Sequence, residues 1–230
     1  HMVRIDMSEY QEKSSIARLL GAPGESGGLL TEPVRKNPFT LILLDEIEKA
    51  HPDILNVFLQ VMDDGRVTDS AGRVVDFTNT IIIATSNAGG GFIQEEMKKG
   101  TTAETIKKVL VEQELKKYFK PEFLNRFDGV IVFKSLSEPD IVAIAKLILI
   151  KLAKQLMDKG ITLRVTDEAI SELAHAGFDP QFGARPLRRV IQELVQDALA
   201  NLLLTQKLGR RDVVVLEKGR VLRVEKAEKL

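Results

Sequence analysis

Two acidic residues, Asp45 and Glu46, directly follow the uninterrupted apolar run at residues 41–44. A run of this length is typical of a parallel strand that is covered on both faces. Ligands of open parallel sheets bind beyond the carboxyl ends of the strands, so these carboxylates stand where a ligand is expected. One carboxylate can hold a hydrated Mg²⁺ while the other polarises an attacking water. The alternative is that the two acids only cap the next helix, because acids are favourable at helix N-termini.

A second apolar run, residues 80–85, is followed by Ser86-Asn87. If it forms the neighbouring strand, Asn87 lies one strand over from Asp45, where its amide can orient a water or contact a terminal phosphate. Asn also commonly ends strands and begins turns. Its value as a candidate therefore comes from its expected neighbours, Asp45 and Glu46.

Two arginines are further candidates. Arg126 lies just before a third apolar run, residues 130–133, although an arginine beside Asp128 is most often part of a surface ion pair. Arg185 lies in Gly183-Ala-Arg-Pro-Leu-Arg-Arg189 at the expected start of a helix. A helix start with an arginine is a natural phosphate site, but arginines near a helix end are most often simply solvated.

The elements that must position these residues alternate between strand and helix. Apolar patterning predicts strands at residues 3–6, 39–44, 80–85 and 130–133, and helices at residues 8–20, 31–36, 52–62 and 103–118. Ser8 is the candidate N-cap of the first helix, and the glycine-rich residues 21–30 are expected to form a loop. This alternation predicts an α/β layer structure with a mainly parallel sheet.

The pattern changes near residue 136. Helices are predicted at residues 138–158, 167–176 and 184–206, a strand at 161–165, and a hairpin at 212–216 and 220–224 that turns at Lys218-Gly219. This order predicts a small α+β domain. We therefore expect a domain boundary near residue 135, which separates residues 1–135 from residues 136–230.

Composition excludes several classes of function. The 230 residues contain 33 Lys and Arg and 33 Asp and Glu, a balance that argues against binding nucleic acid by bulk charge. The absence of cysteine excludes disulfides and thiolate metal sites and suits the cytoplasm. With three histidines, a histidine-built metal site is not expected. No apolar run reaches the roughly 18 residues of a membrane span, so no membrane partner is expected.

Five segments occur in an order that closely resembles the second AAA+ module of the Clp-type ring ATPases, which unfold and disaggregate proteins. The resemblance covers residues 3–224, nearly the whole chain. The segments are Leu41-Ile-Leu-Leu-Asp-Glu-Ile-Glu-Lys-Ala-His51, Asp63-Asp-Gly-Arg-Val-Thr-Asp-Ser70, Ala84-Thr-Ser-Asn87, Pro121-Glu-Phe-Leu-Asn-Arg126 and Gly183-Ala-Arg-Pro-Leu-Arg188.

The resemblance implies a role for each candidate residue. Asp45 corresponds to the Walker B carboxylate on the metal side, and Glu46 to the catalytic base. Asn87 corresponds to the sensor-1 residue. Arg126 corresponds to the arginine finger that reaches the neighbouring subunit's nucleotide. Arg185 corresponds to the sensor-2 residue on the lid domain.

The resemblance also implies the fold and activity of the whole protein. The fold is an AAA+ (P-loop NTPase-like) sheet with flanking helices and a small lid domain. The activity is hydrolysis of ATP to ADP with Mg²⁺ in a homo-oligomeric ring, expected to be a hexamer in the cytoplasm, that threads unfolded or aggregated polypeptide. A protease or co-chaperone is a further expected partner. Members that dock a protease carry an exposed apolar-Gly-apolar tripeptide after the sensor-1 strand, and Gly91-Phe92-Ile93 does not match it. This difference favours a disaggregase or stand-alone chaperone.

The chain departs from the family in two places. It contains no G-x-x-x-x-G-K-[ST], so we expect it to lack the Walker A phosphate loop and the first core strand, and to be inactive by itself. Residues 80–85 and 130–133 should then meet by direct pairing, through a strand of another copy, or by refolding of the first residues. Residues 21–30 contain no aromatic residue, although the family grips substrate with an aromatic-hydrophobic pair there. Residues 63–70 remain a possible second pore-facing loop.

Two other functions remain as alternatives. One is an assembly or structural AAA+ module that does not hydrolyse nucleotide. The other is a nucleic-acid motor or clamp loader, against which the balanced charge and the Ile47-Glu-Lys-Ala-His51 segment both argue.

Overall fold

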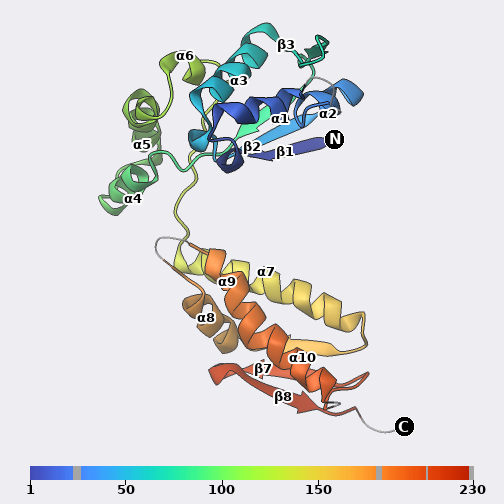
Figure 1. Ribbon diagram of the computed structural model, residues 1–230. Helices are drawn as coiled ribbons and strands as arrows, with labels where there is room; N and C mark the ends of the chain where they lie inside the picture. The colour runs from blue at the N-terminus through green and yellow to red at the C-terminus, as the bar shows by residue number, and fades with distance from the viewer. Residues whose placement is uncertain (23–26, 180–182, 206, 228–230) are drawn as a thin grey trace. The chain divides into compact units, whose positions relative to one another are not determined.

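The strands that the structure describes form three sheets, with the orders β1-β2-β5, β3-β4 and β6-β7-β8 (Figure 1). The structure is a computed structural model that describes residues 1–22, 27–179, 183–205 and 207–227. It divides into two units, His1–Phe133 with the first two sheets and Lys134–Leu230 with the third. Each unit has its own core of buried apolar side chains.

The first unit alternates between strands and helices. Its elements are, in chain order, β1 (Met2–Asp6), α1 (Ile16–Leu20), α2 (Thr31–Lys36), β2 (Leu41–Asp45), α3 (Pro52–Asp64), β3 (Arg66–Thr68), β4 (Val74–Asp76), β5 (Ile81–Ala84), α4 (Gly90–Lys98), α5 (Ala103–Val109) and α6 (Pro121–Leu124). A π-helical turn and a 3₁₀ turn extend α5 to Lys117, so the predicted helix at residues 103–118 is confirmed.

β2 is the central strand of the parallel sheet. It pairs with β1 on one side and β5 on the other, and its Ile42 and Leu44 side chains are buried. An uninterrupted apolar run is typical of a parallel strand that is covered on both faces. The register aligns Asp6 with Asp45 and Leu44 with Ala84, so the three strands end at one edge.

α3 follows the end of β2 closely and has well-defined ends. The Nδ1 atom of His51 accepts a hydrogen bond of 3.1 Å from the backbone N–H of Asp53, and Pro52 occupies the first turn, where its missing N–H costs nothing. Gly65 ends the helix with φ 64°, the left-handed conformation that suits glycine. The helix predicted at residues 52–62 is therefore confirmed.

The helix predicted at residues 8–20 is interrupted. Met7–Glu9 and Lys13–Ser15 form 3₁₀ turns, and only Ile16–Leu20 is α-helical. The side chain of Asp6, rather than that of Ser8, caps the first turn. The break occurs at Tyr10, which is buried and whose carbonyl accepts a hydrogen bond of 2.9 Å from the backbone N–H of His51. This tertiary contact outweighs local helix propensity.

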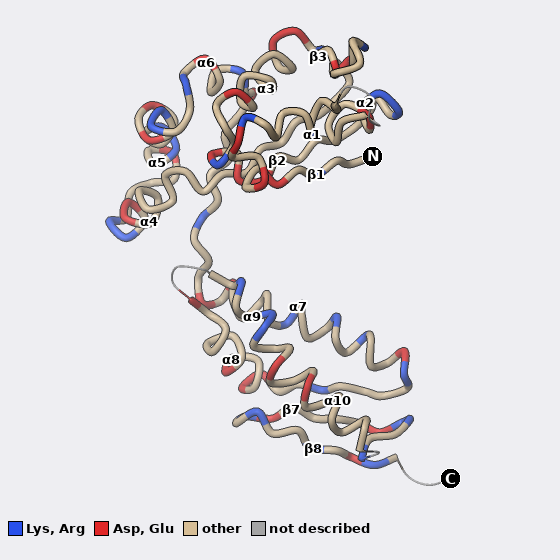
Figure 2. The backbone as a smooth tube through the Cα atoms, in the orientation of Figure 1, with Lys and Arg blue, Asp and Glu red and all other residues tan. Residues whose placement is uncertain are grey.

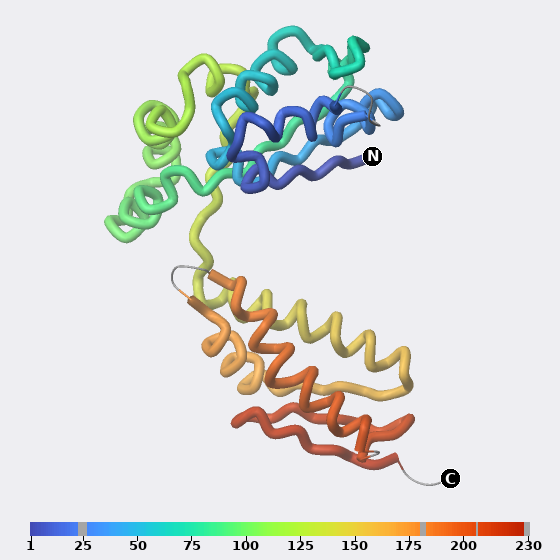
Figure 3. The backbone as a smooth tube through the Cα atoms, viewed as in Figure 1, coloured from blue at the N-terminus to red at the C-terminus, as the bar shows by residue number. Residues whose placement is uncertain are grey.

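The strand predicted at residues 130–133 is not formed. Val130 and Val132 lie against the core, whereas Ile131 and Phe133 are 82% and 85% exposed. The segment thus alternates as a strand does, but within the described part of the chain it pairs with no strand. Figure 3 traces it as the connection that follows α6.

The sequence predicted three ways in which residues 80–85 and 130–133 could find pairing partners, and two of these predictions are wrong. Among the described residues β5 pairs with β2 alone, so it does not join residues 130–133. The first residues form β1 at the far side of β2 and do not refold. Pairing with a strand of another copy stays a prediction. Exposed backbone groups on the β5 edge can be satisfied by water, which is why an open edge is compatible with a folded chain.

The second unit combines helices with a small mixed sheet. Its elements are α7 (Glu138–Met157), β6 (Thr162–Val165), α8 (Asp167–Ala176), α9 (Arg185–Ile191), α10 (Asp197–Leu204), β7 (Val213–Glu217) and β8 (Val221–Glu225). A π-helical turn joins α9 to α10. β6 pairs parallel and β8 antiparallel with β7. Position 206, the end of the predicted helix 184–206, lies outside the described residues.

Local sequence explains the ends of these elements. Ser137 and Asp140 form a reciprocal capping box at the start of α7. Gly219, with φ 76°, allows the turn between β7 and β8, so the predicted hairpin is confirmed. The α/β fold with a parallel sheet, helices around it and a small α+β unit agrees with the sequence prediction. No described helix is both long and apolar enough to cross a membrane.

Candidate functional site

Acidic residues gather where β1 and β2 end (Figure 2). Asp45 is the last residue of β2, and its side chain is 15% exposed. Its Oδ2 atom accepts a hydrogen bond of 2.5 Å from Nε of Arg4 on β1, and its Oδ1 atom accepts one of 3.0 Å from Oγ1 of Thr85. The two contacts hold the carboxylate from both neighbouring chain segments and fix its direction.

Glu46 follows Asp45 but leaves the strand. Its backbone is left-handed, with φ 55° and ψ 48°, which is uncommon for a residue other than glycine. Two contacts to Thr85 support it: the N–H of Glu46 donates to Oγ1 at 3.2 Å, and the N–H of Ile47 donates to the carbonyl at 3.0 Å. The sharp turn, rather than strand alternation, therefore separates the two carboxylates. Strain of this kind clusters at functional sites in proteins.

The Glu46 carboxylate has a lysine partner. Its Oε2 atom lies 2.5 Å from Nζ of Lys49, one turn later in the chain. The hydrogen bond to Glu46 raises the pKa of Lys49, so the lysine stays charged. At the end of β1, hydrogen bonds from the hydroxyl and the backbone N–H of Ser8 lower the pKa of Asp6. The edge of the sheet thus carries fixed, ionised groups.

Asn87 lies beside this edge, as predicted. The chain continues from β5 through Thr85 and Ser86, and Asn87 is exposed. The backbone N–H of Asn87 donates to Oε1 of Glu48 at 3.1 Å, and Oγ of Ser86 donates to Oε2 of Glu48 at 2.8 Å. The segment after β5 is thereby tied to the segment after β2.

The two arginines are both exposed. Arg126 follows α6 and forms an ion pair with Asp63 near the end of α3, not with Asp128. Arg185 is the first residue of α9 in the second unit. Contacts within the first unit bring Asp45, Glu46 and the Asn87 segment together. They do not bring Arg126 to the carboxylates, and Arg185 belongs to the other unit.

The donor set limits the kind of metal that this edge can hold. Among the described residues no group of three His, Cys, Asp or Glu side chains is placed to bind a metal ion. One carboxylate is enough for Mg²⁺, which keeps several waters and takes further ligands from the phosphates of a substrate. Asp45 fits this use, although its Oδ2 atom already accepts a hydrogen bond from the guanidinium of Arg4, with which Mg²⁺ would compete.

Two family models match the chain. The model described as "AAA domain (Cdc48 subfamily)" matches residues 1–130, more than half of the chain. The model described as "C-terminal, D2-small domain, of ClpB protein" matches residues 136–216. The chain belongs to the AAA family. It joins an AAA domain to a ClpB-type small domain, which confirms the predicted Clp-type AAA+ module and its fold.

Curated relatives agree with this assignment to the AAA family. The chain is 47% identical over 225 residues to "ATP-dependent Clp protease ATP-binding subunit ClpE" of Bacillus subtilis, which covers 96% of the chain and 32% of the relative. It is 52% identical over 214 residues to "Chaperone protein ClpB" of Meiothermus ruber, with 91% and 25% covered. For ClpB of Vibrio cholerae the identity is 50% over 211 residues, with 90% and 24% covered. The chain spans about a quarter to a third of the length of these relatives.

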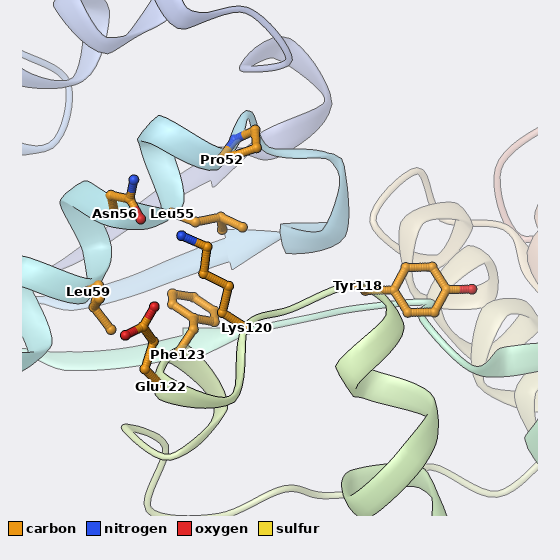
Figure 4. A pocket seen from close by; sticks show the side chains of 8 residues that line it. All are labelled: Pro52, Leu55, Asn56, Leu59, Tyr118, Lys120, Glu122 and Phe123. Carbon is orange, nitrogen blue, oxygen red and sulfur yellow. The ribbon is translucent and has the colours of Figure 1, made fainter.

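A pocket of about 240 Å³ lies elsewhere in the AAA domain, between α3 and residues 118–123. Leu55 and Leu59 of α3 face Phe123, and Tyr118 points away from them (Figure 4). The predicted site residues do not line this pocket. The candidate site thus lies at the end of β2, apart from this pocket.

Sequence reasoning missed three residues of this candidate site. Arg4 and Thr85 contact the carboxylate of Asp45, and Glu48 contacts Ser86 and Asn87. Arg4 and Thr85 lie next to Asp45 only once β1 and β5 flank β2. Thr85 ends the predicted strand 80–85, which was an available signal, whereas Arg4 lies inside the predicted strand 3–6 and Glu48 lies beyond the predicted strand 39–44.

Proposed function

We propose that the edge formed by Asp45, Glu46 and Asn87 is part of an ATP-hydrolysing centre in a Clp-type unfoldase or disaggregase. The observation that carries this proposal is the joint placement of the two carboxylates at the end of β2, with Thr85 bonded to both residues. Phosphoryl transfer needs positioned charges and an oriented water more than covalent chemistry. This edge carries carboxylates and an amide that can provide the charge and orient the water.

Each residue has a distinct role in the proposal. Asp45 would hold a hydrated Mg²⁺, and this ion would supply charge neutralisation for the phosphates of bound ATP. Glu46 accepts the proton of the attacking water, and Asn87 orients that water or contacts the terminal phosphate. Arg126 stabilises the transition-state charge on the nucleotide of a neighbouring subunit. Arg185 contacts the phosphates from the small domain.

The position of Arg126 supports the proposal that this residue acts on the nucleotide of a neighbouring subunit. It is exposed and belongs to the same unit as the carboxylates, yet it pairs with Asp63 rather than with either of them. An exposed arginine in this position is accessible to a nucleotide held by another copy. The proposed assembly is therefore a homo-oligomeric ring, of six subunits by analogy with the family, that acts in the cytoplasm and threads polypeptide.

The relatives include chaperones and an ATP-binding subunit of a protease. For this chain we favour the function of a chaperone that works without a protease. Phe92 and Ile93 are partly buried against the core of the first unit, so Gly91-Phe92-Ile93 is not an exposed docking tripeptide. This observation supports a disaggregase or stand-alone chaperone.

Replacing Glu46 with glutamine tests the proposal in a full-length protein that contains these 230 residues. Glu46→Gln removes the base but leaves Asp45 and the phosphate contacts, so nucleotide binding should persist while turnover falls by at least about 100-fold. Wild-type turnover in this variant would show that Glu46 is not the base.

The isolated chain should behave differently from the full-length protein. It contains no G-x-x-x-x-G-K-[ST], whose backbone N–H groups and lysine make most phosphate contacts. We propose that it binds ATP weakly or not at all and has no turnover, which calorimetry and a phosphate-release assay measure. Micromolar binding would contradict this. Full-length protein that binds ATP without hydrolysing it would favour the non-hydrolysing assembly module.

A further inference from the structure

Glu48 joins the loop after β2 to the loop after β5. It lies in the short 3₁₀ turn Ile47–Lys49 and is partly buried. Its Oε2 atom accepts a hydrogen bond of 2.8 Å from Oγ of Ser86, and its Oε1 atom accepts one of 3.1 Å from the backbone N–H of Asn87. The Ser86 hydroxyl in turn accepts a hydrogen bond of 3.0 Å from the N–H of Ala88. We call this arrangement the Glu48 clamp.

The clamp begins where the sheet can no longer position the chain. The paired register of β2 and β5 ends at Leu44 and Ala84, and backbone hydrogen bonds between the two segments continue only as far as the Thr85 carbonyl. Beyond Asn87 the chain turns at Gly89, which has φ 73°. Asn87 therefore sits between a strand end and a tight turn, and the Glu48 carboxylate is the group that spans this gap. Hydrogen bonds to an ionised acceptor are roughly twice as strong as neutral ones.

Both carboxylate oxygens of Glu48 accept hydrogen bonds from the segment after β5, because the nearby cation, Lys49, is paired with another carboxylate. Nζ of Lys49 lies 2.5 Å from Glu46, so the lysine pairs with the candidate base. The partners of Glu48 are instead two neutral donors on successive residues. Two bonds to adjacent residues restrict the direction of the segment, which a single ion pair between flexible side chains would not do.

We propose that Glu48 is a positioning residue, which holds Asn87 in register with Glu46 without contacting the nucleotide itself. This inference rests on the proposed ATP-hydrolysing function. Its consequence is that loss of the clamp slows the chemical step while the affinity for ATP is unchanged. Because Asn87 is exposed, its freed N–H can bond to water, and the fold should tolerate the loss.

Steady-state ATP hydrolysis by the full-length protein measures the effect. Glu48→Ala should lower kcat about tenfold or more and leave KM within about twofold of wild type. Glu48→Gln should recover part of the rate, since its amide oxygen can still accept from the N–H of Asn87. Glu112→Ala is the matched control, because this exposed glutamate forms no ion pair or side-chain hydrogen bond among the described residues. The Glu112→Ala variant should hydrolyse ATP at the wild-type rate.

A double variant separates positioning from a general structural role. If Glu48 acts through Asn87, adding Glu48→Ala to Asn87→Ala should cause no further loss of kcat, whereas independent effects would multiply. Multiplying losses, or wild-type kcat in Glu48→Ala, would overturn the inference. If the Glu48→Ala variant does not assemble, a double variant that carries Glu48→Gln and Ser86→Ala takes its place, because the two replacements together remove the charged clamp. A wild-type kcat in this double variant would also overturn the inference.

Glu46→Gln in the same assay keeps the two proposals apart. Wild-type turnover in Glu46→Gln would contradict the proposed catalytic centre, and the proposed role of the Glu48 clamp would be rejected with it. Lost turnover in Glu46→Gln together with normal turnover in Glu48→Ala leaves the centre intact and rejects the clamp alone.

Discussion

The hydroxyl of Thr85 donates a hydrogen bond of 3.0 Å to the carboxylate of Asp45 and so joins the ends of β5 and β2. The same oxygen accepts the backbone N–H of Glu46 at 3.2 Å. One side chain thus fixes the direction of the first carboxylate and the left-handed turn that carries the second. The geometry of the site depends on the neighbouring strand as much as on the acids themselves.

Replacing Thr85 with valine keeps the shape of the side chain and removes both hydrogen bonds. We expect the free energy of unfolding of the 230-residue chain to fall by about 0.5–1.5 kcal/mol. Thr85→Ser retains the hydroxyl and serves as the control. Urea unfolding of the two variants measures the difference, and equal midpoints would show that the hydroxyl contributes nothing to the fold.

The ion pair between Arg126 and Asp63 should be easy to break. Both side chains are substantially exposed, at 50% and 32%, and such pairs contribute about 0–1 kcal/mol. Asp63→Asn should therefore lower the free energy of unfolding by less than about 1 kcal/mol, as measured by urea unfolding. A larger loss would mean that Arg126 is held firmly in its own subunit, which argues against its proposed reach to a neighbour.

Asp212 should give the second unit a dependence on acidic pH. A hydrogen bond from Lys226, together with the N–H groups of Ala227 and Gly209, lowers the pKa of Asp212 from 3.8 to about 2. A carboxylate with a lowered folded-state pKa stabilises the fold above its unfolded pKa, and this stabilisation is lost as pH falls through the folded pKa. The contribution of Asp212 should therefore be complete above about pH 4 and decline towards pH 2.

Acid unfolding of Asp212→Asn checks this prediction. The variant should be less stable than wild type at pH 6, and the difference should shrink between pH 4 and pH 2. Asp158→Asn, at an exposed residue after α7, is the control and should follow wild type throughout. A difference between Asp212→Asn and wild type that stays constant with pH would contradict the assigned pKa.

Two isoleucines test the description of the first unit. Ile42, in the central strand β2, is fully buried, whereas Ile131 is 82% exposed. Ile42→Ala should destabilise the 230-residue chain by about 2–5 kcal/mol, and Ile131→Ala should lie within about 0.5 kcal/mol of wild type. Thermal or urea unfolding gives both values. A large loss in Ile131→Ala would indicate that residues 130–133 are covered in solution, as pairing with a strand of another copy would require.

Much of this fold was accessible from sequence because local patterns and tertiary contacts agree. The apolar run before Asp45 forms the central strand, and the Ser137 cap starts α7. The prediction failed where distant residues decide the backbone. The carbonyl of Tyr10 bonds to the N–H of His51, which interrupts an otherwise helical pattern. Residues 130–133 keep strand alternation but not strand pairing, because pairing requires a neighbour that no local pattern reveals.

The sequence predicted the position of the acidic residues of the candidate site, but not the residues that hold them in place. The position of Asp45, Glu46 and Asn87 at one edge follows from two parallel strands that end together. The left-handed turn at Glu46 and the contacts from Arg4, Thr85 and Glu48 depend on which strands are adjacent and in which register. Register is a property of the folded sheet, so these residues emerge only with the structure.

The central claim is that Glu46 of one subunit and Arg126 of another act on the same ATP. Arg126→Ala and Glu46→Gln should each abolish turnover in the full-length protein and spare nucleotide binding. Mixing the two variants creates interfaces at which a wild-type Glu46 meets a wild-type Arg126. Phosphate release by the mixture, with ring assembly checked by sedimentation, is therefore the most direct measurement. The account predicts that hydrolysis partly returns; assembled mixed rings as inactive as either variant alone would contradict it.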